Sequence, residues 1–534
     1  MKNVLLPILT GLLLTCIWGN GWAQLTIIAD MDTSFANGGK VETSLSGYGD
    51  EITDFYGVFP DQQLTSKITV CGKSGTSTPG LYKLGMIQLN PKGTFDPSFG
   101  TNGKVMMNWG ISDYPNRMYV NPIDSSIVMA GMSASSVNIV DHLPALFKFK
   151  KNGVPDSGFG GDGHIAVRFD SITGGEFTNI YAEGNNYLAC GAISNSFHLE
   201  GFCAMRFFPN GKLDSSFGSK GKAFIPVNLS SVLGFLTTND TITFIGVAAV
   251  MDSEPPIQVP IVFGRMTPQG KTDSTFGKAG VVISTVLSTG VPIIAATQPN
   301  YQIVAAIPPF AGSLSVPFEI VRFSNNGAVD SSYGTNGFVT VHFSPGVSEA
   351  KGINIAKNGK AVVNGWADNK CATVRLNPDG SPDITFNQIG RAKIDIDSGA
   401  YSNYLLRFVG IGNKRYIGVG SSIHNGISQF LVARFRDDTL QSGVAPAPEA
   451  NNDVIKIYPN PASSGFTIET PAEISGTITI VDALGRDVQT LDQNNYISDM
   501  KSYLLDASKM PDGIYYCLVQ KGKEKIVRKF MVMH

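Results

Sequence analysis

The fold is indicated by Asp96-Pro97-Ser98-Phe99-Gly100-Thr101-Asn102-Gly103, because the spacing of these residues recurs along the chain. The pattern is Asp, two residues, an aromatic residue, three residues and Gly. Its copies have Asp32, Asp96, Asp156, Asp214, Asp273, Asp330 and Asp383, then Phe35, Phe99, Phe159, Phe217, Phe276, Tyr333 and Phe386, then Gly39, Gly103, Gly163, Gly221, Gly280, Gly337 and Gly390. Seven copies, with aspartates 53 to 64 residues apart, indicate a repeat architecture.

Two positions before each aspartate keep the same register. A glycine stands three residues before it at Gly93, Gly153, Gly211, Gly270, Gly327 and Gly380. A basic or amide residue stands eight before it at Gln88, Lys148, Arg206, Arg265, Arg322 and Arg375, and Arg434 holds that place in the last predicted strand. The glycine suits a tight turn with positive φ, and the aspartate can cap the backbone after it. We expect the aromatic residue to form a wedge between neighbouring units.

Each unit contains about four short apolar runs, which predict β-strands. In the second unit they are residues 104–108, 117–120, 126–130 and 145–150. Four strands per repeat suit the blade of a β-propeller, and blades arranged in a ring bury one another's faces. The sequence therefore predicts an all-β fold with a seven-bladed β-propeller. An open β-solenoid is the alternative, but it needs capping elements that we do not find.

The repeated residues have a structural explanation and a chemical alternative. Calcium binding at the aspartates would need several oxygens converging on one point, which one Asp per turn does not supply. The recurrent Arg and Lys residues would attract anions if they formed a ring around a channel. Pairing with the nearby turn aspartate is the other interpretation, because a cation in an apolar strand needs a partner.

The runs Asp96–Gly103 and Asp214–Gly221, with turns such as Asn377-Pro378-Asp379-Gly380, resemble the delta-60 repeat family. The resemblance covers about residues 25–436. It implies a β-propeller-like fold and little chemistry. This chain departs from the family pattern at Ala36 and Asn387, where the family has Gly, and at Gly158, where it has Ser.

The pattern ends after Arg436, and residues 437–453 have the composition of a linker. Residues 454–534 contain seven strand candidates, at 454–458, 465–469, 476–481, 486–491, 502–505, 514–520 and 525–532, which predict a small Ig-like β-sandwich. Its landmarks are Pro459, Asn460 and Pro461, then Asp482, Gly485 and Arg486, then Gly513 and Tyr515. They resemble the type A C-terminal sorting domain of the type IX secretion system of Bacteroidota. The resemblance implies recognition by an outer-membrane translocon, usually cleavage, and release or attachment to surface lipopolysaccharide. An Ig-like module that stays attached is the alternative.

Residues 1–23 read as a signal peptide. Lys2 precedes an apolar run over 4–18, and we expect cleavage between Ala23 and Gln24. A membrane anchor is an alternative, but the run is shorter than the about 20 residues that span a bilayer. Cys16 makes a lipoprotein a further alternative. We otherwise expect no transmembrane segment.

Composition limits the functions that the chain can have. It has 534 residues, 43% hydrophobic and 16% charged, with a net charge of −2. A protein that neutralises phosphates needs clustered Lys and Arg, so the composition argues against a general nucleic-acid binder. Five cysteines follow the signal peptide, without a CxxC pair, so neither a disulfide framework nor a zinc site is expected. Cys190 and Cys203 lie on neighbouring predicted strands and are expected either to pair or to be buried thiols.

The sequence contains no nucleophile elbow, metalloprotease helix or phosphate loop. We expect no catalytic, metal or cofactor site, although a site assembled from distant blades would be invisible in sequence. Two long apolar loops, with Pro255, Pro256 and Ile257 and with Pro308, Pro309 and Phe310, are predicted to share one face and to contact a partner. The prediction is a secreted or surface-exposed binding or adhesion scaffold with a protein or glycan ligand, delivered by type IX secretion. A propeller-type polysaccharide hydrolase or lyase is the alternative.

Overall fold

A computed structural model describes most of the chain. The described residues are 31–57, 67–136, 141–169, 174–194, 199–238, 241–248, 259–288, 294–307, 317–343, 347–356, 358–387, 389–394, 396, 403–410, 415–436, 456–459, 462–471, 478–482, 487–491, 500–521 and 524–534. The regular elements among them are β-strands, in two compact units, Met1–Gly443 and Val444–His534. Within these ranges no helix has the length and apolarity needed to cross a bilayer. The predicted all-β class is confirmed.

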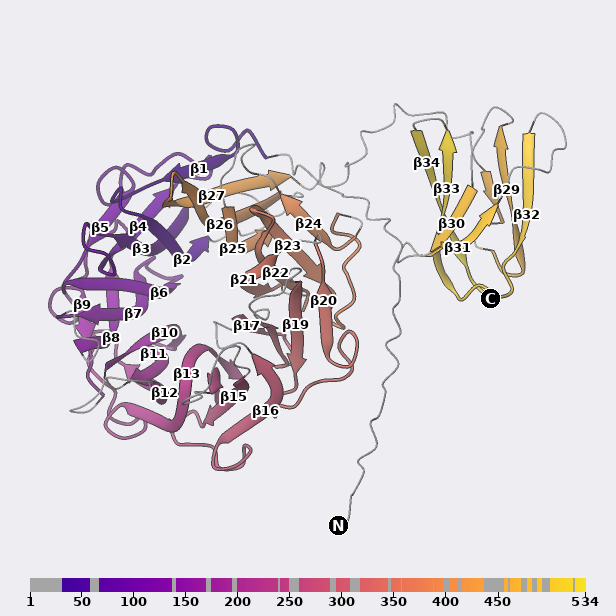
Figure 1. The fold of residues 1–534 in the computed structure, drawn as a ribbon. Helices are drawn as coiled ribbons and strands as arrows, with labels where there is room; N and C mark the ends of the chain where they lie inside the picture. Colours follow the sequence, from indigo (N-terminus) through magenta and orange to yellow (C-terminus); the bar gives the residue numbers. More distant parts are fainter. Residues whose placement is uncertain are drawn as a thin grey trace, which may run out of the picture. The chain divides into compact units, whose positions relative to one another are not determined.

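The first unit is a ring of antiparallel sheets (Figure 1). Blade 1 consists of β2 (Asp50–Gly57), β3 (Ile68–Gly75), β4 (Tyr82–Leu89) and β5 (Lys104–Met107), and blade 2 of β6 (Ser112–Val120), β7 (Ile127–Ala134), β8 (His142–Phe149) and β9 (His164–Ala166). Blade 5 consists of β17 (Ile294–Thr297), β18 (Ile303–Ile307), β19 (Phe318–Phe323) and β20 (Phe338–Val341), and blade 6 of β21 (Ser348–Ile355), β22 (Ala361–Ala367), β23 (Lys370–Leu376) and β24 (Arg391–Ile394). Each blade runs in chain order from an inner strand near the centre of the ring to an outer strand.

Blades 3 and 4 share one long strand, β13 (Lys222–Thr238), within a seven-stranded sheet. The sheet contains β10 (Gly174–Glu183), β11 (Asn186–Ser194) and β12 (Leu199–Phe207) on one side of β13, and β14 (Thr241–Ala248), β15 (Val259–Met266) and β16 (Val281–Ser288) on the other. The first part of β13 pairs with β12 and the later part with β14. The described strands form seven four-stranded meanders. This number counts β13 in both blade 3 and blade 4 and includes blade 7, described next.

Blade 7 joins the two ends of the ring. It consists of β25 (Asn403–Gly410), β26 (Arg415–His424) and β27 (Ile427–Arg436), and its outer strand is β1 (Lys40–Thr43) from the start of the chain. Lys40 pairs with Ala433, and Thr43 pairs with Phe430. Each sequence unit therefore spans two blades. The run 104–108, which we predicted to share a blade with 117–120, is instead the outer strand of the preceding blade, and this part of the prediction is wrong.

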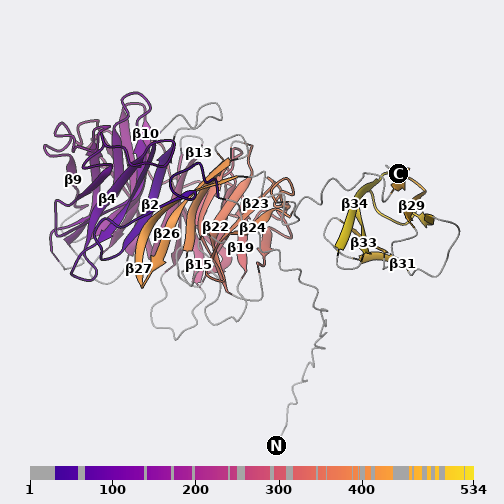
Figure 2. The ribbon, with the colours of Figure 1, turned by 90° about the horizontal axis from the view of Figure 1, so that it is seen from above.

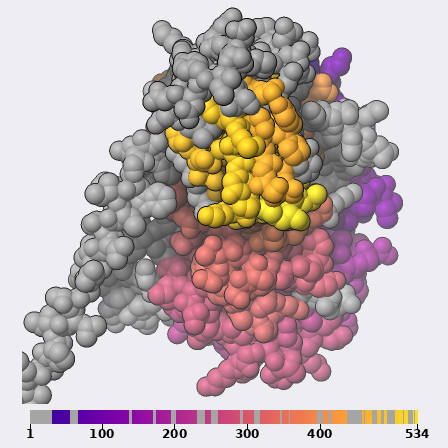
Figure 3. Space-filling model, turned by 90° about the vertical axis from the view of Figure 1, so that its right-hand side faces the viewer, coloured from indigo at the N-terminus to yellow at the C-terminus, as the bar shows by residue number. Residues whose placement is uncertain are grey.

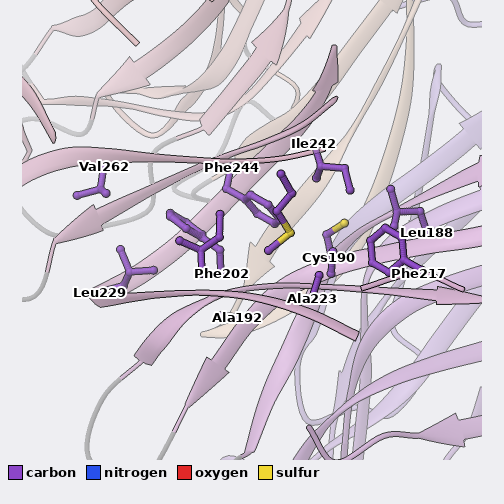
Figure 4. Close-up of a cluster of buried hydrophobic side chains, with 13 residues drawn as sticks. Leu188, Cys190, Ala192, Phe202, Phe217, Ala223, Leu229, Ile242, Phe244 and Val262 are labelled. Carbon is purple, nitrogen blue, oxygen red and sulfur yellow. The ribbon is translucent and has the colours of Figure 1, made fainter. Parts of the chain in front are cut away.

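The middle strands are buried because neighbouring blades cover both of their faces. β7, for example, is buried along its whole length. Between blades 3 and 4, Leu188, Cys190, Phe202 and Phe244 form one such core (Figure 4). Figure 2 shows the blades side by side from another direction.

The two cysteines that could have paired lie on opposite faces of blade 3. Cys190 is opposite Ala204, and Cys203 is opposite Gly191, so the two are offset by one residue across the ladder. Side chains alternate between faces along a strand, so the offset directs the thiols into different cores. Both are buried free thiols.

The second unit contains two sheets. One consists of β28 (Lys456–Tyr458), β29 (Gly465–Pro471) and β32 (Met500–Asp506), and the other of β30 (Ile478–Asp482), β31 (Asp487–Leu491), β33 (Gly513–Lys521) and β34 (Glu524–Val532). Phe466, Ile480 and Phe530 lie in a common core. The described side chains of this unit form a continuous yellow and orange surface in Figure 3. All seven predicted strands are present, with ends shifted by up to two residues, and the predicted sandwich is confirmed.

Candidate functional site

The repeated aspartate is the centre of a local hydrogen-bond cluster, which Asp214 illustrates. Its Oδ1 accepts hydrogen bonds from the backbone N–H of Ser216 at 3.0 Å and from the hydroxyl of Ser216 at 2.7 Å. Its Oδ2 lies 2.8 Å from Nε of Arg206. The guanidinium also lies over the ring of Phe217, 5.0 Å from its centroid. One carboxylate thus fixes the turn, while the cation is held between a charge and an aromatic ring.

The same cluster connects each blade to the next. The backbone N–H of Gly218 donates to the carbonyl oxygen of Gln269 in the following blade, at 2.8 Å. A Cβ on Gly270, which has φ of +75°, would lie 2.7 Å from the ring of Phe217. Glycine is therefore required there for its backbone conformation and for the neighbouring ring. The aromatic residue does pack between units.

The recurrent basic residues are paired with the aspartates. Within 4 Å are the pairs Lys148–Asp156, Arg206–Asp214, Arg265–Asp273, Arg322–Asp330, Arg375–Asp383 and Arg434–Asp32. Gln88 instead donates to Thr69, and Asp96 is paired with Lys67. Burial opposes ionisation of Asp383, but hydrogen bonds from Lys360 and Thr385 and the charge of Arg375 outweigh it and lower its pKa to about 2. These residues form ion pairs within each blade and not an open ring of cations.

A second polar set, which we call the inner-strand arc, lies at matching positions on the strands nearest the centre of the ring. These strands carry a β-bulge, and the residue two positions before the unpaired residue of the bulge is Glu or Tyr. Its members are Glu51 on β2, Tyr114 on β6, Glu176 on β10, Glu349 on β21 and Tyr404 on β25. The equivalent side chains of β13 and of the segment before β17 lie outside the described residues.

Members of the arc contact one another between blades. The hydroxyl of Tyr404 donates to Glu51 at 3.3 Å, and the hydroxyl of Tyr114 donates to Glu176 at 3.4 Å. Lys73 lies 2.8 Å from Glu51 and also lies over Tyr114, 6.0 Å from the ring centroid. Blades 7, 1, 2 and 3 are thus joined by alternating carboxylates and tyrosines.

Blade 6 continues the arc with a second ion pair. Nζ of Lys351 lies 2.8 Å from Oε1 of Glu349, and the indole N–H of Trp366 donates to Oε2 at 3.2 Å. The same ammonium lies 6.0 Å from the ring centroid of Tyr404 in blade 7. The carboxylate is therefore matched by a cation, as Glu51 is by Lys73.

Glu176 has no cation within ion-pair distance in the described structure. Burial raises the pKa of its carboxyl, and hydrogen bonds from the Asn116 amide at 2.9 Å and the Tyr114 hydroxyl only partly offset this. A carboxyl whose pKa is raised holds its proton more readily than an ordinary glutamate does, which is a property of general acids. Glu176 thus differs from Glu51 and Glu349, which each have a lysine partner.

A second layer lies just past the bulges. Asp54 on β2 accepts a hydrogen bond from the backbone N–H of Met118, at 2.9 Å. Arg117 and Arg407, at 3.6 and 3.9 Å, approach it from the blades on either side. This buried carboxylate joins three inner strands, so we assign the layer a structural role.

A pocket of about 230 Å³, the blade 1 pocket, lies beside the arc. It is lined by Tyr48, Gly49, Glu51, Lys73, Gly75, Thr76, Thr78, Pro79, Gly80, Leu81, Tyr82 and Ser428. Connections alternate between the two faces of a meander, so the β3–β4 connection in this pocket lies on the face opposite the repeated turns. β14 and β18 end, and β15 and β19 begin, at that same face, because these strands hold the same places in their blades.

A larger cavity, of about 720 Å³, lies on the face of the repeated turns. Its lining includes Tyr181, Glu183, Arg206 and Gln269. Because Arg206 already bonds Asp214 and lies 3.7 Å from Glu183, its charge is balanced within the blade. The charged group in this cavity is therefore less available to a ligand than the ion pair in the blade 1 pocket.

Several sequence-predicted positions lie outside the described residues. They are the cleavage pair Ala23 and Gln24, the partner-face residues Pro255, Pro256, Ile257, Pro308, Pro309 and Phe310, and the sorting-domain residues Asn460, Pro461, Gly485 and Arg486. Of the other landmarks, Pro459 follows a cis peptide bond, Asp482 and Gly513 lie at strand ends, and Tyr515 donates from its hydroxyl to the carbonyl of Pro511 at 2.7 Å. In the described ranges no three His, Cys, Asp or Glu side chains converge as a metal site.

The inner-strand arc was not predicted from the sequence. Its members follow the last glycine of the repeat by 11 residues (Gly103 to Tyr114) to 14 residues (Gly390 to Tyr404). A search for acidic or aromatic residues at that distance would have found it. A search for identical residues at a fixed spacing misses the arc, because its members are either Glu or Tyr and their distance from the glycine varies.

Comparisons with known proteins agree with the two units. Residues 456–533 match the family described as a secretion system C-terminal sorting domain, and residues 357–386 match a domain of unknown function (DUF5122) beta-propeller. No match was found among the curated proteins.

Similar solved structures include PorZ, a type IX secretion surface component of Porphyromonas gingivalis, at 11% identity and a TM-score of 0.29, with 93% of this chain and 71% of that chain covered. A protein of unknown function from Dyadobacter fermentans has 11% identity and a TM-score of 0.38, with 75% and 98% covered. The β-propeller domain of the Trilobed protease from Pyrococcus furiosus has 10% identity and a TM-score of 0.37, with 75% and 98% covered. Similarities this low carry no functional argument.

The sorting-domain match, the two-sheet C-terminal unit and the ring of blades together identify the protein. The tail directs export by type IX secretion to the cell surface or the extracellular space. The chain is a β-propeller protein with a type IX secretion system C-terminal sorting domain.

Proposed function

We propose that this protein is an exported binding scaffold, in which the propeller holds a ligand and the C-terminal domain provides delivery. The observation that carries the proposal is the inner-strand arc. It places carboxylates, tyrosines and lysines at one level on consecutive blades, where they can offer donors and acceptors to one ligand. The ring itself is held together by a different set of residues, the repeated ion-pair clusters.

The state of the carboxylates supports binding. Glu51 and Glu349 are each held in place by a lysine at 2.8 Å. Groups fixed in this way are suited to recognising a polar ligand. The tail is proposed to be removed after translocation, and the loops with Pro255 and Pro308 to extend the binding face.

A glycan array and a polysaccharide-turnover assay on the purified exported chain test the proposal. Retention of a glycan or surface polymer without release of fragments supports a scaffold. Release of reducing ends or unsaturated products would overturn it.

Glu176 favours a second candidate, a polysaccharide hydrolase or lyase. Its raised pKa suits a general acid, and Tyr114 and Glu51 belong to the same arc. In that case Glu176→Gln would abolish turnover while leaving polymer binding intact. Turnover that persists in this variant would exclude Glu176 as its acid.

A further inference from the structure

The blade 1 pocket has the composition of a site for a neutral, hydroxyl-rich ligand. Oε2 of Glu51 and Nζ of Lys73 lie 2.8 Å apart within it, and both side chains are partly exposed, at 43% and 28%. The carboxylate accepts and the ammonium donates, so the pair offers both kinds of hydrogen bond in one place. Because the charges cancel, the pair does not select for an anion or a cation.

Aromatic rings accompany the ion pair. Tyr48 is 64% exposed, and Tyr82 lies beneath Lys73 with its centroid 5.2 Å from Nζ. Tyr82 is itself held by an edge-to-face contact with Tyr114, at 5.9 Å between centroids. The pocket therefore combines an exposed ring with one fixed by the arc. Aromatic side chains combine an apolar face with a polar tip and suit ligands that have both kinds of surface.

Glycine and threonine residues shape the pocket. A Cβ on Gly75 would lie 2.8 Å from the carbonyl oxygen of Gly49, so this close approach requires glycine. The hydroxyl of Thr76 accepts a hydrogen bond from the N–H of Thr78 at 3.2 Å and donates to its carbonyl at 3.0 Å, which fixes the β3–β4 turn. The pocket is thus built by defined local contacts.

We propose that the blade 1 pocket binds one uncharged sugar residue, an identification that deepens the binding function proposed above. The sugar hydroxyls bond to Glu51 and Lys73, and its apolar face packs on Tyr48. An apolar ligand would remove water from the ion pair without replacing its hydrogen bonds. The volume of about 230 Å³ lies below the range typical of drug-sized ligands, roughly 300–1,000 Å³, which favours one ring over a longer segment.

Saturation-transfer NMR and calorimetric titration on the exported chain test this, with methyl glycosides of neutral hexoses and N-acetylhexosamines as probes and glucuronic acid for comparison. At least one neutral glycoside should bind. Glu51→Gln and Tyr48→Ala should each weaken its binding about tenfold or more, as expected for loss of a charged hydrogen bond or a stacked ring. Tyr48 is exposed, so Tyr48→Ala tests the pocket without affecting the fold.

Glu42→Gln and Tyr301→Ala are matched controls, because they change a lysine-paired glutamate on β1 and a partly exposed tyrosine in blade 5. Both should leave glycoside binding unchanged. The inference is overturned if no neutral glycoside binds, or if Glu51→Gln and Tyr48→Ala bind as the parent does. Polymer retention on the array that survives both substitutions would uphold the scaffold while removing this pocket from it.

Discussion

Nε of Arg434 lies 2.8 Å from Oδ2 of Asp32, although nearly the whole propeller sequence separates the two residues along the chain. In the other ion-pair clusters of this type the cation precedes its aspartate by eight residues. Here the last strand supplies the cation and the first turn supplies the carboxylate. The repeat pattern thus continues across the point where the chain ends meet, and this contact closes the ring together with the β1–β27 ladder.

Asp32→Asn should be the most destabilising aspartate substitution in the repeats. Asp32 is fully buried, and Arg415 and Arg436 approach it at 2.9 and 3.2 Å in addition to Arg434. Breaking a buried ion pair by removing one partner costs about 3–5 kcal/mol. Urea unfolding measures the change. Asp214→Asn, where a single arginine loses its partner, is the matched control and should cost less, and equal losses at the two sites would contradict the closing role of Asp32.

Stability should fall in acid as the repeated aspartates protonate. Burial opposes ionisation of Asp32, but hydrogen bonds from Ser34 and the charge of Arg434 lower its pKa to about 2, as similar contacts do for Asp383. A folded-state pKa below the unfolded value of about 3.9 gives stability that is present above pH 4 and lost as pH falls toward 2.

Thermal melts between pH 6 and pH 2 measure this loss. The Asp32→Asn variant cannot lose the stability that ionised Asp32 provides. The melting temperatures of the variant and the parent should therefore approach each other as the pH falls. A gap between the two that stays constant down to pH 2 would contradict the assignment.

Glu176→Gln should show the opposite pH dependence. Because burial raises the folded-state pKa of Glu176, the contribution of this carboxyl to stability is fully present below the unfolded value of about 4.3 and is lost as pH rises through the folded value. The neutral amide avoids that loss. The melting temperature of Glu176→Gln should exceed that of the parent at pH 8 and match it more closely at pH 4. A difference independent of pH would contradict a folded-state pKa above the unfolded value.

Gly270→Ala tests the contact between blades that the aromatic residue makes. Gly270 and Gly38 have similar φ values, +75° and +71°, but only at Gly270 would a Cβ meet a neighbouring ring, that of Phe217. Gly38→Ala therefore measures the backbone strain alone. We expect Gly270→Ala to cost about 1–3 kcal/mol more, as overpacking does, in denaturant unfolding. Equal costs would show that the ring can move aside.

The repeat allowed the propeller and its ion pairs to be predicted, because seven copies of Asp, an aromatic residue and Gly carry the same local geometry. Ala36 and Asn387 depart from the repeat in residue type but keep its backbone conformation. Their φ values are +48° and +52°, and the equivalent Gly218 has +53°. The division into blades was not predictable from one unit, since the turn at Gly103 leads into a strand that pairs backwards with β4. The blade to which a strand belongs is decided by its pairing with other strands, which one unit of sequence does not show.

The arc was harder to predict for a related reason. Glu51 and Tyr404 are far apart in sequence and differ in chemistry, and only ring closure brings them within 3.3 Å. Inner strands also tolerate changes of side chain, because a bulge and not a particular residue fixes the position. The cysteines illustrate the same limit: only the register shows that Cys190 and Cys203 face different cores.

Disulfide trapping of β1 against β27 tests the closed ring most directly. Lys40 and Ala433 are partners in the ladder, so cysteines placed at both should oxidise to an intramolecular disulfide, while Lys40→Cys with Leu431→Cys, two residues out of register, should not. A closed ring should give a faster-migrating monomer on a non-reducing gel for the first pair only, and reductant should return it to the mobility of the parent. An absence of that species, or disulfide-linked dimers in its place, would contradict closure of the propeller by its own first strand.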